Sequence, residues 1–381
     1  MSRIRTLTVL GTRPEAIKLA PVCHALAAAP EDFESRVLVT AQHRDLLDRA
    51  LADFQLAPDY DLDLMRPNQD LFHTTSAALT GLKDVLQRDR PDVVIVQGDT
   101  TTTFVGALAA FYAKVPVAHV EAGLRTGNKY SPFPEEMNRR MTSCLADLHF
   151  APTPGAVENL TREGVRSADV VLTGNTGIDA LMWVLRHRAP TFSAVLPERA
   201  CAALGRRYLL LTTHRRESFG APMLEALGAV REICEARPDV SVLFPVHPNP
   251  NVRSEVAAVL SGLANVHLTD PLDYVNFAHL MAGAEIILTD SGGIQEEAPS
   301  LSRPVVVLRE TTERPEGVAA GVAVLVGTKR ERIRGEVLRL LQDSSHYRSM
   351  IGKPNPYGDG TAAARIVDTL RARMRPGQRR A

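Results

Sequence analysis

The chain has few cysteines, no excess of either charge and no long apolar run. Its four cysteines include no Cys-x-x-Cys pair, so neither a zinc site nor a disulfide framework is predicted; they are Cys23, Cys144, Cys201 and Cys234. Lys plus Arg and Asp plus Glu both number 44, which excludes an overall basic field for nucleic acid or a membrane surface. No apolar run reaches transmembrane length and no signal peptide is recognisable, so we expect a cytoplasmic protein.

The motifs of several common enzyme classes are also missing. No G-x-G-x-x-G follows a predicted strand, which leaves nicotinamide-dependent hydride transfer without support. The first strand is not followed by a P-loop, and no G-x-S-x-G nucleophile motif occurs. No cluster of His, Cys and Asp has metal-ligand spacing, so we expect neither a metal nor a cofactor.

What is present is a regular alternation of strand and helix patterns over 381 residues, enough for two domains. This alternation predicts an α/β fold with two doubly wound, Rossmann-like domains whose strands are parallel. We place the N-terminal domain at residues 1–174 and the C-terminal domain at 175–360, with Gly174 to Gly177 at the boundary. A last helix, 361–375, is expected to pack back on the N-terminal domain.

Ionisable residues follow three separate strands of the N-terminal half. Arg13 comes just after the first strand, Asp99 ends the strand from Val93 to Val96, and Glu121 ends the strand from Val115 to Val120. Because parallel strands end at one sheet edge, these side chains are expected to lie in one crevice. Any one of them alone would be read as a structural cap.

The stretch from Ile286 to Pro299 predicts a strand, a turn with two adjacent glycines, and a short helix that begins near Ile294. Gly292 and Gly293 let the backbone approach a ligand closely, since neither has a Cβ. The N–H groups of the following helix and the hydroxyl of Ser291 would then bind a phosphate. The alternative is an ordinary helix N-terminus with dipole-compensating glutamates.

Two such domains, each with charged loops at one sheet edge, predict a ligand in a cleft between them. A phosphate site with basic residues, histidines and carboxylates suits a nucleotide-sugar. At this point the chain resembles the non-hydrolysing UDP-N-acetylglucosamine 2-epimerases, over nearly its whole length and in the same order. The matching motifs are Gly11 to Lys18, Gln97 to Thr100, His119 to Gly123, Pro132 to Glu136, His214 to Glu217, Asp290 to Pro299 and Glu310 to Glu316.

This resemblance implies the glycosyltransferase-B architecture, a homodimer, and interconversion of UDP-N-acetylglucosamine and UDP-N-acetylmannosamine for cell-surface polysaccharide synthesis. It implies the catalytic residues Asp99, Glu121, Glu135 and His214. The substrate contacts that it implies are Arg13, Lys18, Asp99, Glu121, His214, Leu272, Phe277, Ser291, Gly292, Gly293, Glu297 and Arg314. Leu272 stands where some members have glutamine, so only a backbone contact to the uracil would remain there.

Some bacterial members carry a second, allosteric UDP-N-acetylglucosamine site, which by resemblance would involve Gln42, His43 and Gln69. Asp45 and Asn68 stand where those members have a glutamine and an arginine. Losing an arginine removes a bidentate phosphate partner. Two rival functions stay open: a hydrolysing 2-epimerase that releases N-acetylmannosamine and UDP, and a nucleotide-sugar sensor or glycosyltransferase without epimerase activity.

Overall fold

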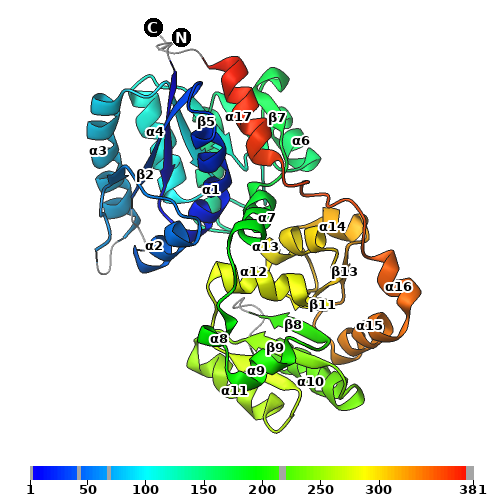
Figure 1. Cartoon of the computed structure of the whole chain (residues 1–381). Helices are drawn as coiled ribbons and strands as arrows, with labels where there is room; N and C mark the ends of the chain where they lie inside the picture. The colour runs from blue at the N-terminus through cyan, green and yellow to red at the C-terminus, as the bar shows by residue number, and fades with distance from the viewer. Residues whose placement is uncertain (1–2, 41–43, 67–69, 214–219, 375–381) are drawn as a thin grey trace. The chain divides into compact units, whose positions relative to one another are not determined.

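A computed structural model describes residues 3–40, 44–66, 70–213 and 220–374, and the chain divides into two compact units. Unit 1 contains residues 1–183 and 358–381, and unit 2 contains residues 184–357 (Figure 1). The sequence places the boundary at Gly174, nine residues earlier. The difference arises in the helix that begins at Thr176, because the Asp179 carboxylate accepts hydrogen bonds from the backbone N–H groups of Ala362 and Ala363, at 3.2 and 2.9 Å.

Unit 1 contains a parallel sheet which, in the described residues, has seven strands in the order β3-β2-β1-β4-β5-β6-β7. The strands are β1 (Ile4–Leu10), β2 (Phe33–Val39), β3 (Tyr60–Asp61), β4 (Val93–Gln97), β5 (Val117–Val120), β6 (Leu148–Ala151) and β7 (Val170–Leu172). The helices are α1 (Arg13–Ala27), α2 (Arg44–Asp53), α3 (Leu71–Asp89), α4 (Thr101–Tyr112), α5 (Glu135–Leu145), α6 (Pro154–Arg162), the 3-10 turn η1 (Ser167–Asp169), α7 (Thr176–His187) and α17 (Ala362–Arg373).

Helices cover both faces of this sheet, as the near-continuous apolar strands require. Leu7 and Val9 of β1 are fully buried against α3 and α4. The alternate residues of a strand point to the other face, where α1 packs on β1 and β2. In sequence α1 and α17 lie far apart, but they pack side by side (Figure 1).

Unit 2 repeats the scheme with a parallel sheet of six strands, among the described residues, in the order β10-β9-β8-β11-β12-β13. The strands are β8 (Tyr208–Thr212), β9 (Ser241–Pro245), β10 (Val266–Thr269), β11 (Ile286–Thr289), β12 (Val305–Val307) and β13 (Ala323–Leu325). The helices are α8 (Phe192–Val195), α9 (Glu198–Ala203), α10 (Ala221–Ala236), α11 (Pro250–Leu260), α12 (Tyr274–Gly283), α13 (Gly292–Glu297), the 3-10 turn η3 (Ala298–Leu301), α14 (Pro315–Ala319), α15 (Arg330–Gln342) and α16 (Ser344–Ser349).

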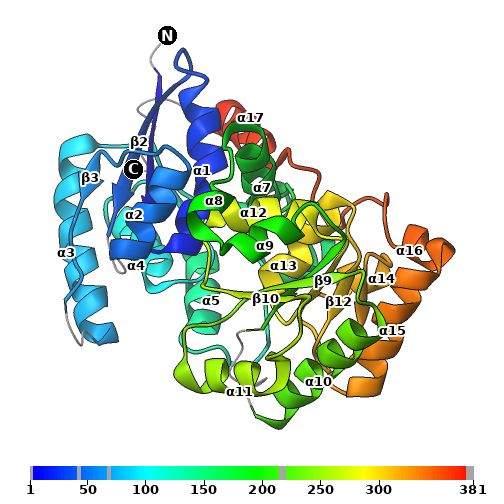
Figure 2. The ribbon, with the colours of Figure 1, turned by 60° about the horizontal axis from the view of Figure 1, so that its bottom comes forward.

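The main core of unit 2 lies between the sheet and the helices α10, α11 and α15. Leu209 and Leu211 of β8 pack there with Leu227 of α10 and with Ile333 and Val337 of α15, all nearly inaccessible to solvent. Accordingly α10 and α15 run side by side, which both views of the ribbon show (Figures 1 and 2).

In each unit the strand order reverses once, between β1 and β4 in unit 1 and between β8 and β11 in unit 2. Open α/β sheets bind their ligands outside the carboxyl ends of the strands at such a switch point. We therefore expect ligand-binding residues in the turns after β1, β4, β8 and β11. Two parallel, doubly wound sheets also confirm the predicted α/β fold class. In the described part of the chain, no helix is both long and apolar enough to cross a membrane.

Candidate active site

At the carboxyl edge of the unit 1 sheet, the structure joins Glu121 and Lys18. Glu121 directly follows β5, and its carboxylate accepts hydrogen bonds from Lys18 Nζ at 2.6 and 2.7 Å. The Gln97 side-chain amide, at the end of β4, donates to the same carboxylate. Glu121 is only 8% exposed and has a left-handed backbone, with φ of +62°. Such a conformation is costly for a residue other than glycine and concentrates at functional sites.

Asp99 lies beside this pair along the sheet, in the turn after β4. Its carboxylate forms an ion pair with Arg139 of α5, and its backbone carbonyl accepts a hydrogen bond from Asn138 Nδ2 at 3.0 Å. Arg139 is itself held by Glu136, with 3.4 Å between Nη1 and Oε2. The Asp99 side chain remains 30% exposed, so a ligand can still reach it.

Two further predicted residues stand at the starts of helices. Arg13 is the first residue of α1 and Glu135 the first of α5, and both are half-buried. Among the described residues, neither side chain has a hydrogen-bond or ion-pair partner. A carboxylate and a guanidinium in that state remain available to a ligand.

The neighbouring glutamate, Glu136, has a structural role that the sequence did not predict. Its carboxylate is fully buried and accepts hydrogen bonds from the backbone N–H groups of Thr126 and Gly127, at 3.0 and 3.2 Å. Glu136 therefore fixes the loop between β5 and α5 as well as Arg139.

A buried histidine is hydrogen-bonded to the turn that contains Asp99. His119 of β5 donates a hydrogen bond from Nε2 to the carbonyl oxygen of Gly98 at 2.8 Å, and it pairs in register with His149 of β6. Burial lowers the pKa of His119 to about 3, and burial also lowers the pKa of His149. Both imidazoles are therefore neutral in the folded protein at neutral pH.

We expect His119→Gln to weaken the acid sensitivity of folding. In the unfolded chain His119 binds a proton near pH 6.5, whereas in the folded protein it does so only near pH 3. The contribution of His119 to the free energy of unfolding is therefore fully present above pH 6.5 and falls as the pH decreases toward 3. At pH 5 the decrease amounts to about 2 kcal/mol. Urea unfolding at pH 7 and pH 5 measures this difference.

His73→Gln is the matched control for this measurement, since His73 is exposed on α3. It should leave the wild-type pH dependence unchanged. An equal loss of stability at pH 5 in wild type and His119→Gln would show that His119 does not stay neutral in the fold.

In unit 2, the predicted start of the glycine-turn helix is wrong by two residues. The helix α13 begins at Gly292, so both glycines belong to its first turn, and Ser291 is the N-cap residue. The two glycines accept helical geometry here, and the turn after β11 is shorter than predicted. The Ser291 side chain makes no capping hydrogen bond, which leaves its hydroxyl for another partner. A Cβ added to Gly293 would meet no atom of the described residues within 4 Å.

The end of α13 is tied to the segment that follows β12. Glu296 is 5% exposed and forms an ion pair with Arg314, and the Thr312 hydroxyl donates to Gln295 Oε1 at 2.6 Å. Glu296 therefore already has a cationic partner within unit 2. Glu297, the last residue of α13, is half-buried.

Of the remaining predicted binding residues, some lie within the described part of the chain and others do not. Leu272 lies between β10 and α12, Phe277 lies in the first turn of α12, and both are half-buried. His214 and the allosteric candidates Gln42, His43 and Gln69 fall outside the described residues.

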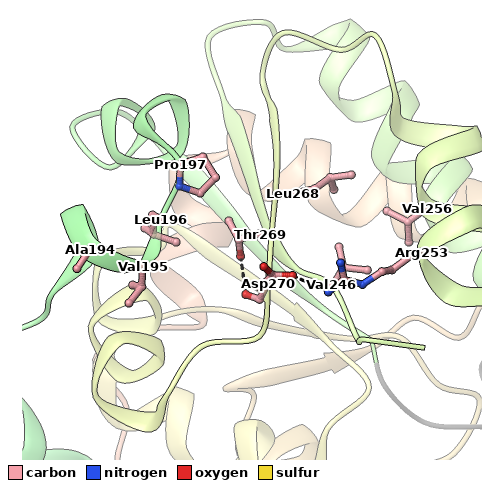
Figure 3. A pocket seen from close by; sticks show the side chains of 10 residues that line it. All are labelled: Ala194, Val195, Leu196, Pro197, Val246, Arg253, Val256, Leu268, Thr269 and Asp270. Carbon is pink, nitrogen blue, oxygen red and sulfur yellow. Dashed lines mark hydrogen bonds and ion pairs between the residues drawn. The ribbon is translucent and has the colours of Figure 1, made fainter. Parts of the chain in front are cut away.

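Unit 2 also contains a cavity of about 420 Å³ at the carboxyl ends of β9 and β10. It is lined mainly by apolar side chains, and Arg253 pairs there with Asp270 at 2.5 Å between Nη2 and Oδ1 (Figure 3). Within the described part of the chain, none of the residues predicted to contact substrate lines this cavity.

Sequence reasoning missed the residues that hold the carboxylates, chiefly Gln97 and Arg139. Gln97 belongs to a recognised motif and ends a strand, which was an available signal. Arg139 had none, because its contact with Asp99 depends on how α5 packs against α4 and β5.

Taken together, the two parallel sheets and their polar switch points define the class, a two-unit Rossmann-like protein of the glycosyltransferase-B type. The glycosyltransferase SnogD of Streptomyces nogalater shares this fold, with a TM-score of 0.59 at 18% identity over 97% of this chain and 99% of SnogD. A family model described as UDP-N-acetylglucosamine 2-epimerase matches residues 24–371. The chain belongs to the UDP-N-acetylglucosamine 2-epimerase family.

Individual relatives agree with this assignment. The UDP-N-acetylglucosamine 2-epimerase of Yersinia pestis is 53% identical over 372 residues, which cover 97% of this chain and 98% of the relative. The crystal structure of the UDP-N-acetylglucosamine 2-epimerase of Neisseria meningitidis, bound to UDP-N-acetylglucosamine, superposes with a TM-score of 0.83 at 46% identity. That match covers 96% of this chain and 99% of the other.

Proposed function

We propose that this protein interconverts UDP-N-acetylglucosamine and UDP-N-acetylmannosamine by inverting C2 of the sugar. The observation that carries the proposal, beside family membership, is the cluster at the edge of the unit 1 sheet. There Glu121 with Lys18, and Asp99 with Arg139, place two carboxylates with attached cations at the ends of adjacent strands. A protein that only binds a nucleotide-sugar has no need of such an acid–base set.

The chemistry of the substrate restricts the route. The C2 proton has no neighbouring carbonyl, so simple enolisation is closed to it. Without a ketone intermediate, the route that we propose is elimination: the C2–H bond breaks, a base takes the proton, and UDP leaves from C1. The product is 2-acetamidoglucal, and UDP adds back at C1 while a proton is delivered to the opposite face of C2.

This route needs a base on one face of the sugar and an acid on the other. We assign these tasks to Asp99, Glu121 and Glu135. Glu121 and Asp99 each lie against a cation, whereas Glu135 has no such partner among the described residues. His214 is assigned to assist at the diphosphate.

The departing diphosphate needs positive charge and N–H donors. We assign Arg13, Lys18, Arg314 and the first turn of α13 to this task. Ser291, Gly292 and Gly293 would face the phosphates, Glu297 the ribose, and Leu272 and Phe277 the uracil. A homodimer and a role in cell-surface polysaccharide synthesis remain predictions from the resemblance.

Turnover of UDP-N-acetylglucosamine in heavy water tests the proposal. We expect UDP-N-acetylmannosamine that carries deuterium at C2, because a carboxyl group exchanges its proton with solvent between turnovers. A slow release of 2-acetamidoglucal and UDP is also expected, since the intermediate is held without a covalent bond. NMR spectra of the products measure both.

The same spectra distinguish the rival functions. Free N-acetylmannosamine with UDP would indicate a hydrolysing enzyme, and unchanged substrate would indicate a sensor. Epimer formed without solvent deuterium would exclude the proton-transfer route.

A further inference from the structure

Glu15 is a buried carboxyl group that the assignments above do not use. It lies in the first turn of α1, is 1% exposed, and accepts four hydrogen bonds. Oε2 accepts from the Gly11 N–H at 3.0 Å and the Thr12 hydroxyl at 2.7 Å, and Oε1 from the hydroxyls of Thr100 at 2.7 Å and Thr103 at 3.1 Å. Burial raises the pKa of this carboxyl, although the four hydrogen bonds oppose the rise.

The four partners belong to two different turns. Gly11 and Thr12 form the turn after β1, which directly precedes Arg13. Thr100 and Thr103 belong to the start of α4, which directly follows Asp99. Glu15 therefore joins the two turns on either side of the switch point, and these turns carry an assigned phosphate ligand and an assigned acid–base residue.

The network continues to the third assigned group. The Thr103 hydroxyl lies 2.6 Å from the carbonyl oxygen of Gln97, and the Gln97 side chain donates to Glu121. One buried carboxyl thus connects to the segments that hold Arg13, Asp99 and Glu121.

A helix-dipole role is the plain alternative, since a glutamate in the first turn of a helix is favourable there. A carboxylate in that role needs only the N-terminus of α1 and can remain exposed to solvent. Here Oε1 is directed entirely at another helix, and the group is desolvated. Burying a carboxyl group costs free energy, and only well-placed hydrogen-bond donors offset that cost.

We propose that Glu15 is a positioning residue, which sets the distance between the Arg13 turn and the Asp99 turn for the epimerisation. The proposal rests on the proposed function. A displacement of about 1 Å between reacting groups can reduce turnover by roughly 10²-fold. Loss of the link between the turns should therefore lower kcat more than it lowers substrate affinity.

Thr100→Val is the first test, because valine keeps the volume of threonine and removes its hydrogen bond to Glu15. We expect kcat for epimerisation to fall by roughly 10–100-fold, with KM and the UDP dissociation constant changed by less than about threefold. Thr100→Ser, which keeps the hydroxyl, should restore most of the turnover.

Thr100 is also the N-cap of α4, so the control must lose an N-cap as well. Thr153→Val provides this, because Thr153 is the N-cap of α6, also in unit 1, and its hydroxyl accepts from the Ala156 N–H. It should keep wild-type turnover while losing a similar amount of thermal stability.

Glu15→Gln and Glu15→Ala complete the test. Glutamine keeps one oxygen for the Gly11 N–H and offers an N–H group to threonine hydroxyls, which can also accept, so partial activity is expected. Glu15→Ala removes all four hydrogen bonds and should give the whole of the expected decrease in kcat. Adding Thr100→Val to Glu15→Ala should then lower kcat no further.

If Thr100→Val reduces kcat no more than Thr153→Val does, or if the two losses in the double variant multiply, Glu15 does not act through this link. Should Glu15→Ala fail to fold, the three threonine variants decide the question alone. Absence of epimerisation in the wild type would instead overturn the proposed function, and the assignment with it.

Discussion

Glu121→Gln is expected to reduce kcat by roughly 10²–10⁴-fold, the usual range for loss of a general acid or base. Glutamine has nearly the same shape and can adopt the same left-handed backbone, but it cannot exchange a proton. It also withdraws the negative charge that faces Lys18 at 2.6 Å. The assigned diphosphate groups do not include Glu121, so we expect UDP affinity to fall by less than about tenfold.

Initial rates of epimerisation and titration calorimetry with UDP measure the two effects separately. Glu163→Gln is the control, because the same chemical change is made at a carboxylate that pairs with Arg125 in unit 1. Glu163 is not among the residues assigned to the chemistry or to substrate binding, so its turnover should stay within twofold of wild type. Equal turnover in both variants would remove Glu121 from the proposed chemistry.

Gly293→Val is expected to weaken UDP binding by roughly 100-fold, which corresponds to ~2.7 kcal/mol. The physical reason is the open space at this position, where an added Cβ meets no atom of the described chain within 4 Å. The fold therefore tolerates the side chain, and only a ligand that approaches the first turn of α13 would be displaced by it. Calorimetry with UDP, alongside the thermal midpoint of the free protein, gives both quantities.

Gly335→Val provides a matched control in unit 2. Gly335 lies in α15, is exposed, and an added Cβ there would likewise meet no atom within 4 Å among the residues that the structure describes. Both variants make the same Gly→Val exchange in a helix, and valine is not a poorer helix former than glycine. If UDP affinity falls equally in both, or in neither, the first turn of α13 does not contact the diphosphate.

The alternation of strand and helix patterns was sufficient to predict parallel sheets, because each connection crosses over through a helix. That in turn predicted that Asp99 and Glu121 would lie at one carboxyl edge of a sheet, and the strands they follow, β4 and β5, are parallel neighbours. The start of α13 was less accessible, since the two glycines favour a turn by local propensity. In the structure both glycines nevertheless belong to the first turn of α13.

By itself, the sequence determined the fold class, the family, and which residues follow the carboxyl ends of strands. These depend on periodicity, on turn residues and on chain order, which are local properties. Only the tertiary structure decided which partners hold those residues: Arg139 at Asp99, Lys18 and Gln97 at Glu121, and four donors at Glu15. Such contacts join elements up to 103 positions apart, and their geometry is set by side-chain packing between helices and strands, which no local pattern encodes.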